Sequence, residues 1–164
     1  MSKSELKVGD LIPLSKDTYD QTLECIEKLT NLSIEYSNMI DFYDPFQLEE
    51  IKRKWNGYMT QFAVCFSKIK KFKGSQHVYC DEVRKEIKSQ ALQLLLDEGV
   101  KVTSAESLVY GTEYYKERVL LIQDVKEFFI KTDLLYERFE YTFQSIIQSL
   151  STARKEFDAS KHTQ

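Results

Sequence analysis

A strict three-four spacing of apolar residues near the C-terminus constrains this chain more than any other feature. Successive members of this stripe lie three or four residues apart, and all but Thr132 are apolar. A mean spacing of 3.5 residues keeps one side of a helix turned toward a partner helix, as in coiled coils. The stripe consists of Ile122, Val125, Phe129, Thr132, Tyr136, Phe139, Phe143, Ile146, Leu150, Ala153 and Phe157.

No proline or glycine lies between Thr112 and Phe157, so the sequence predicts one helix over these 46 residues. Such a helix is about 69 Å long, whereas a compact domain of this size is roughly 40 Å across. We therefore expect an elongated, all-α, coiled-coil-like bundle of helical hairpins that forms oligomers. The residues expected to form the subunit interface are Phe129, Tyr136, Phe143 and Leu150.

The composition fits a helical domain with a core. Hydrophobic residues make up 42% of the chain and charged residues 30%, which separates it from disordered sequences. No apolar run approaches the ~18 residues that cross a bilayer, and the first residues lack the apolar core of a signal peptide. Three widely spaced cysteines, Cys25, Cys65 and Cys80, favour a reducing compartment. We expect a cytoplasmic protein, in the host cytoplasm if a phage encodes it.

The chain is predicted to contain one helical domain over residues 17–157. An irregular arm (residues 1–16) precedes this domain and a frayed tail (residues 158–164) follows it. Within the domain, the predicted helices cover about residues 18–42, 45–73, 78–98, 104–110 and 112–157. The helix at 45–73 has its own stripe at steps of three and four: Leu48, Ile51, Trp55, Tyr58, Phe62, Cys65, Ile69 and Phe72.

Capping signals support these boundaries. Capping boxes of the form Thr-x-x-Gln/Glu start at Thr18 and Thr103, and Asp44-Pro45 is a typical helix start. Three glycines are expected to end or break helices: Gly74, Gly99 and Gly111. In the helix at 78–98 we expect five residues to face inward, namely Tyr79, Val83, Ile87, Leu94 and Leu95.

Basic residues concentrate between Lys68 and Lys88. Seven basic and three acidic side chains give this segment a net charge of +4, although the whole chain has a net charge of -3. A basic surface on an acidic protein is a candidate anion site. Phe72, His77 and Tyr79 lie among the cations, a mixture typical of single-stranded nucleic-acid binding. The candidate binding residues are Lys68, Lys70, Lys71, Lys73, Arg84, Lys85 and Lys88.

An alternative interpretation of this segment remains open. The same cations fit the solvated face of an amphipathic helix whose Phe72 and Tyr79 belong to the core. One copy with about four phosphate contacts would bind weakly, and repetition in an oligomer would raise the affinity by avidity.

The sequence contains no pattern typical of an enzyme. It has neither a glycine-rich phosphate loop nor a dinucleotide fingerprint. His77 and Cys80 have a metal-ligand spacing, but a structural zinc site needs four ligands and no second pair exists. The acidic pair Glu49 and Glu50 projects at different angles from one helix, which indicates a solvated face. We expect no catalysis, no cofactor and no bound metal.

Three segments in order resemble phage recombination mediators of the UvsY type. First comes the basic amphipathic stretch VCFSKIKKFKG (residues 64–74). The basic stretch DEVRKEIKSQALQLL (residues 81–95) follows it. The third is VTSAESLVYGTEYYKERVLLIQDVKEFFIKTDLL (residues 102–135), which leads into the long C-terminal helix. The resemblance covers roughly residues 55–157, and the N-terminal stretch before it, of about sixty residues, is not matched.

The resemblance implies a fold, partners and a role. Mediators of this type are small helical proteins that form ring-shaped homo-oligomers and bind single-stranded DNA. They help a RecA-like recombinase displace single-stranded-DNA-binding protein, and they contact both proteins. Their DNA-contacting residues lie on the basic helix before the glycine turn, where this chain has Lys68, Lys70, Lys71 and Lys73.

We therefore expect a non-enzymatic recombination mediator that binds single-stranded DNA as a homo-oligomer. The alternative is a phage structural, scaffold or adaptor protein built as a helical bundle. It would contain the same apolar stripes without affinity for nucleic acid.

Overall fold

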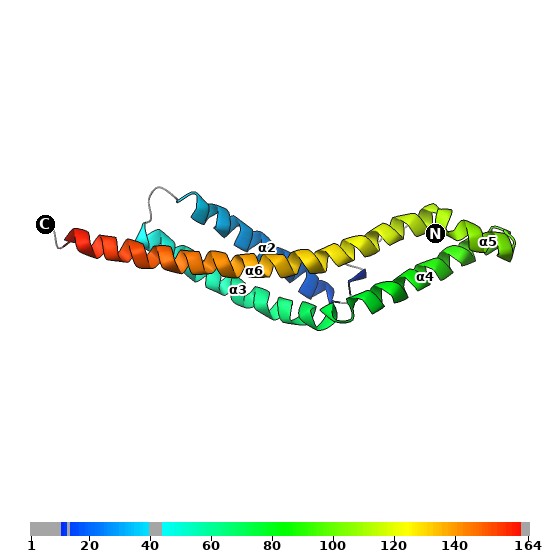
Figure 1. The fold of residues 1–164 in the computed structure, drawn as a ribbon, viewed down its shortest axis with the longest axis horizontal. Helices are drawn as coiled ribbons and strands as arrows, with labels where there is room; N and C mark the ends of the chain where they lie inside the picture. The colour runs from blue at the N-terminus through cyan, green and yellow to red at the C-terminus, as the bar shows by residue number, and fades with distance from the viewer. Residues whose placement is uncertain (1–10, 13, 40–43, 162–164) are drawn as a thin grey trace. The chain divides into compact units, whose positions relative to one another are not determined.

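The computed structural model describes residues 11–12, 14–39 and 44–161, and every regular element among them is a helix (Figure 1). This confirms the all-α fold with a long C-terminal helix. In chain order, the elements are α2 (Lys16–Ser37), α3 (Pro45–Lys73), α4 (Gln76–Asp97), α5 (Val102–Leu108), the short 3-10 helix η1 (Val109–Gly111) and α6 (Glu113–Lys161). Most of the predicted irregular arm lies outside the described residues.

The chain divides into two compact units, where the sequence predicts a single domain. Unit 1 comprises Ile69–Lys131 and the described residues before Asp17, and unit 2 comprises Asp17–Lys68 and the residues from Thr132 onward. Unit 1 therefore holds α4, α5, η1 and the first part of α6. Unit 2 holds α2, most of α3 and the second part of α6.

In unit 2, three helices lie side by side around an aromatic core (Figure 1). The Trp55 ring of α3 meets the Phe139 ring of α6 edge-on, with centroids 5.9 Å apart. The Phe62 ring lies 6.0 Å from that of Phe139. From α2, Cys25, Leu29 and Leu32 complete the buried cluster. Edge-on aromatic pairs add about 0.5–1.5 kcal/mol each to the free energy gained by burial.

In unit 1, α5 and η1 connect α4 to α6 and pack against α4 (Figure 1). The buried residues of α4 are Cys80, Ile87 and Ala91. The prediction for Leu94 is wrong, because its side chain is 45% exposed. The apolar residues of α4 do not follow one regular three-four spacing. The spacing therefore could not tell which side of the helix is buried, and it placed Leu94 on the inward side.

Both long stripes are confirmed by burial. On α6 the stripe is buried from Ile122 to Ala153, with Tyr136 and Phe143 partly exposed, and Phe157 is 41% exposed. The stripe of α3 is also buried, apart from the partly exposed Tyr58 and Phe72. Because α6 continues to Lys161, residues 158–161 are helical and are not the frayed tail that the sequence predicts.

Three of the predicted boundaries have a helix cap or a helix stop in the structure. The Phe46 amide donates to Asp44 Oδ1 (2.9 Å) at the start of α3. Thr112 Oγ1 accepts from the Tyr115 amide (3.2 Å) at the start of α6. After α4, Gly99 has φ of +83°. Two backbone hydrogen bonds complete a Schellman motif there: the Gly99 amide donates to the Leu96 carbonyl, and the Val100 amide to the Leu95 carbonyl.

The two predicted threonine capping boxes are wrong. α2 begins at Lys16, so Thr18 lies inside the helix, where its carbonyl accepts from Thr22 Oγ1 (2.6 Å). α5 begins at Val102 after Lys101, and no side chain caps it. In both cases the helix begins before the threonine, so the hydroxyl is not at the terminus.

We predict opposite effects of alanine at two glycines. Gly99→Ala should lower the free energy of unfolding by about 1–2 kcal/mol, because an L-residue is strained at positive φ. Gly57 lies inside α3, and a Cβ added there would meet no other atom within 4 Å, so it is the matched control. Gly57→Ala should raise stability by about 0.5–1 kcal/mol. Urea unfolding followed by circular dichroism measures both. Equal effects of the two substitutions would contradict this account.

Candidate nucleic-acid interface

Six of the seven predicted binding residues lie in unit 1. Lys70, Lys71 and Lys73 lie in the last turn of α3, where cations also interact favourably with the negative end of the helix dipole. All three are exposed. On α4, Lys85 is exposed, and Arg84 and Lys88 are partly exposed and one helical turn apart.

Lys68 belongs to unit 2 and has a structural contact. Its Nζ donates to Oγ1 of the buried Thr18 on α2 (3.3 Å). The amine therefore helps to join α3 to α2, and this hydroxyl occupies one of its three donors. Lys68 therefore has a role in packing α3 against α2, although it lies one helical turn before Lys71.

The remaining cations differ in how many contacts their side chains make within the chain. Arg84 lies 3.7 Å from Asp81 on the same helix, and Lys88 lies 4.9 Å above the Tyr110 ring. A hydrogen bond to Tyr110 and the charge of that residue raise the pKa of Lys88. Within the described part of the chain, the side chains of Lys71 and Lys85 make no ion pair or hydrogen bond. These two amines are therefore the most available for an anion.

A cluster of tyrosines and cations was missed by the sequence analysis. We call Lys88, Tyr110, Tyr114, Tyr115 and Arg118 the aromatic–cation cluster. The Arg118 guanidinium covers the Tyr114 ring at 3.6 Å, and the rings of Tyr110 and Tyr115 meet edge-on at 5.3 Å. The Tyr114 hydroxyl donates to Gln90 Oε1 of α4 (2.5 Å).

The cluster presents an aromatic surface beside the α4 cations. Tyr110 is 50% exposed although it contacts both Lys88 and Tyr115. An exposed ring held in place by neighbours loses little freedom when a flat ligand stacks on it. Its members come from three elements, α4, η1 and α6. The only hint of the cluster in the sequence is that Tyr110, Tyr114 and Tyr115 lie close together around Gly111.

The rings that the sequence singled out have different surroundings. His77 is exposed and Phe72 is partly buried. The Tyr79 hydroxyl donates to the Leu11 carbonyl within unit 1, which gives this ring a structural contact. For Tyr79, the structure therefore favours the alternative interpretation, in which the ring packs within the protein and does not bind nucleic acid.

Most of the predicted subunit-interface residues are buried or packed within a single chain. Phe129 and Leu150 are each 3% exposed. Tyr136 stacks on Phe66 with centroids 4.2 Å apart, and Phe143 packs against the core of unit 2. The stripe on α6 therefore needs no second subunit to be buried, and oligomerisation remains a prediction.

The three cysteines are buried, and the environments of Cys25 and Cys80 favour the thiol form. Burial, with smaller effects of Cys65 and Glu24, raises the pKa of Cys25 to about 11. Burial also raises the pKa of Cys80. His77 and Cys80 gain no further ligands, since the described residues contain no group of three or more histidine, cysteine or carboxylate side chains placed to hold a metal. None of the described helices has an apolar stretch long enough to cross a bilayer.

We predict that the native thiols react slowly with Ellman's reagent at pH 8. Cys25, Cys65 and Cys80 are at most 3% exposed, and the raised pKa of Cys25 leaves little thiolate at that pH. In urea all three thiols should react at once. A thiol that reacts in the native protein as fast as in urea would contradict the burial described here.

Comparison with known proteins leaves the chain without an assigned family: no protein-family model, curated protein or solved structure matches it.

Proposed function

We propose that this protein is a non-catalytic recombination mediator that binds single-stranded DNA through unit 1. The observation on which the proposal depends is the group of basic residues at the end of α3 and on α4, of which Lys88 lies over the half-exposed ring of Tyr110. The resemblance of three segments to mediators of the UvsY type supports the same proposal. Partners would be a RecA-like recombinase, single-stranded-DNA-binding protein and further copies of this chain.

Electrostatics provides the first part of the argument. Residues 68–88 have a net charge of +4 on a chain whose net charge is -3, so the remainder repels a polyanion. A strand would thus be directed to this segment. Lys71 and Lys85 can each pair with a phosphate without breaking an internal contact.

The aromatic–cation cluster provides the second part. Bases of a single strand are free to stack on protein rings, which stabilises a complex by about 1–3 kcal/mol per base. Tyr110 is half exposed and lies under Lys88, so a base on this ring would have a cation beside it for the adjacent phosphate. Paired bases of a duplex have no free faces, so this chemistry favours single strands.

Binding of this kind gives a mechanism without catalysis. A strand held through phosphates and stacked bases is held independently of sequence, as a mediator requires. Several copies along one strand would weaken the grip of a competing single-strand binder and leave ordered DNA for the recombinase.

We predict that Lys71→Glu/Lys85→Glu weakens binding to all single-stranded oligonucleotides alike. The slope of log affinity against log salt should become less negative by about 1.4, at about 0.7 per lost phosphate contact. Fluorescence anisotropy with a labelled oligonucleotide measures both quantities. Lys28→Glu/Arg53→Glu, two exposed cations of unit 2, is the matched control and should change binding far less. Equal losses in the two double variants would contradict a site in unit 1, and absence of binding by the wild type would favour the scaffold alternative.

A second prediction concerns stacking on Tyr110. Tyr110→Ala should weaken oligonucleotide binding by about 5- to 150-fold, which corresponds to the loss of one stacked base. Tyr110→Phe retains the ring and should bind within about threefold of the wild type. The comparison separates stacking from general charge. Identical affinities of the alanine and phenylalanine variants would show that no base stacks on this ring.

A further inference from the structure

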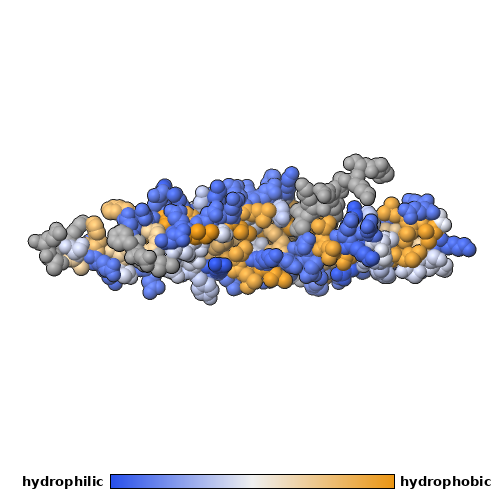
Figure 2. Space-filling model, turned by 90° about the horizontal axis from the view of Figure 1, so that it is seen from above, coloured by the Kyte–Doolittle hydropathy of each residue, from blue (hydrophilic) through white to orange (hydrophobic). Residues whose placement is uncertain are grey.

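Arg118 lies on α6 in unit 1, outside the basic segment at residues 68–88. On the face of the molecule that Figure 2 shows, hydrophobic and hydrophilic residues reach the surface in patches, so charge alone does not mark a site. What distinguishes Arg118 is how its side chain is held. The guanidinium carbon lies 3.6 Å from the centroid of the Tyr114 ring, which belongs to the preceding turn of the same helix.

The Tyr114 ring is itself tied to a second helix. Its hydroxyl donates to Gln90 Oε1 on α4 (2.5 Å). The side-chain amide of Gln90 in turn donates from Nε2 to Glu86 Oε1 on the same helix (3.4 Å). Because these bonds hold Tyr114 against α4, the plane on which the guanidinium of Arg118 lies is fixed before any ligand binds.

The hydrogen-bond donors of Arg118 are left without partners by the chain itself. A guanidinium has five N–H donors, and all of them lie in its plane. Within the described residues Arg118 makes no ion pair and no hydrogen bond, and its side chain is partly exposed. The contact with Tyr114 uses a face of the guanidinium, so the edges that hold the N–H groups remain free to donate.

The free edge of Arg118 fits a phosphate that belongs to a nucleotide. Two parallel N–H groups of a guanidinium match two phosphate oxygens, and such charge-assisted hydrogen bonds are about twice as strong as neutral ones. A phosphodiester offers two non-bridging oxygens at every nucleotide, whatever its base. Tyr110 contacts both Lys88 and Tyr115, which is the neighbour of Tyr114. A ring for a base and a guanidinium for a phosphate therefore belong to one cluster.

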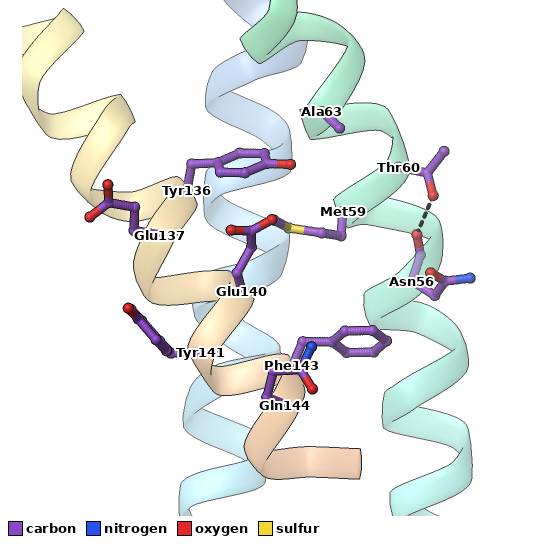
Figure 3. A pocket seen from close by; sticks show the side chains of 10 residues that line it. All are labelled: Asn56, Met59, Thr60, Ala63, Tyr136, Glu137, Glu140, Tyr141, Phe143 and Gln144. Carbon is purple, nitrogen blue, oxygen red and sulfur yellow. Dashed lines mark hydrogen bonds between the residues drawn. The ribbon is translucent and has the colours of Figure 1, made fainter.

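The groove of unit 2 offers no comparable site. It has a volume of about 710 Å³ and lies between α3 and α6 (Figure 3). Glu137 and Glu140 are among its lining residues, and none of the described lining residues is basic. These carboxylates repel a phosphate, so the groove does not compete with unit 1 for a strand.

We propose that Arg118 binds a phosphate of the single strand through the free edge of its guanidinium, and that Gln90 acts through Tyr114 as a positioning residue. The Tyr114 ring fixes the plane of the guanidinium, and Gln90 fixes the ring. This inference rests on the proposed function, since the phosphate belongs to the bound DNA. It adds to that site a contact outside residues 68–88.

Replacement of Arg118 in the full-length protein tests the phosphate contact, by fluorescence anisotropy with a labelled single-stranded oligonucleotide. Arg118→Ala should weaken binding by about 10- to 150-fold, through the loss of charge-assisted hydrogen bonds. It should also make the slope of log affinity against log salt less negative by about 0.7. Arg118→Lys keeps the charge and the slope, but it should bind at least about fivefold more weakly than the wild type, because an ammonium group lacks the planar fork. Lys116→Ala, which removes an exposed cation two residues away, is the matched control and should weaken binding by less than about threefold.

A double-mutant cycle tests the role of Gln90. Gln90→Ala should weaken binding by about three- to tenfold when Arg118 is present, and it should have no further effect in the Arg118→Ala background. A residue that only stabilises the fold would weaken both backgrounds equally. Unchanged circular dichroism spectra check that the substitutions leave the helices intact.

The outcomes separate this inference from the proposed function. An Arg118→Ala variant that binds no more weakly than Lys116→Ala would overturn the inference, as would an Arg118→Lys variant equal to the wild type. An effect of Gln90→Ala that persists without Arg118 would overturn the role of Gln90. A wild type that binds no oligonucleotide would overturn both the proposed function and the inference, whereas a wild type that binds, with Arg118→Ala and Lys116→Ala alike, would remove the inference alone.

Discussion

Burial of the α6 stripe against α2 and α3 is the interaction on which unit 2 depends. Trp55, Phe62 and Phe139 meet edge-on in the centre, and Ile146 and Leu29 are fully buried beside them. Each such side chain contributes about 1.5–3 kcal/mol by leaving water. Because the stripe is buried within the chain, it is not available for contacts with other molecules.

The strongest sequence patterns were reliable because they arise from burial along one helix. Steps of three and four residues placed the stripes of α3 and α6 on the side that the structure buries. Where the pattern is weak, as in α4, it placed Leu94 inward although the side chain is half exposed. The start of α3 was predictable because Asp44 followed by Pro45 fits so few other structures. The start of α2 was not predictable from Thr18, because threonine also occurs within the first turns of helices, as it does here.

The candidate site was only partly predictable, because its parts are distant in the sequence. A run of lysines is visible as charge, but the internal contact of Lys68 with Thr18 requires knowing that α2 and α3 are neighbours. The aromatic–cation cluster joins Lys88 to residues 22 or more positions later. Spacing rules act within one helix and cannot find such a cluster.

Trp55 is the single tryptophan of the chain, and the structure places it at 0% exposure in unit 2. Its indole N–H has no hydrogen-bond partner among the described residues. An indole in so dry a setting should emit at short wavelength, and its fluorescence should shift to the red when water enters the core. Unit 2 thus contains its own optical reporter, while the tyrosine-rich unit 1 has none at that wavelength. Emission from this one residue would follow the opening of unit 2 separately from the total loss of helix.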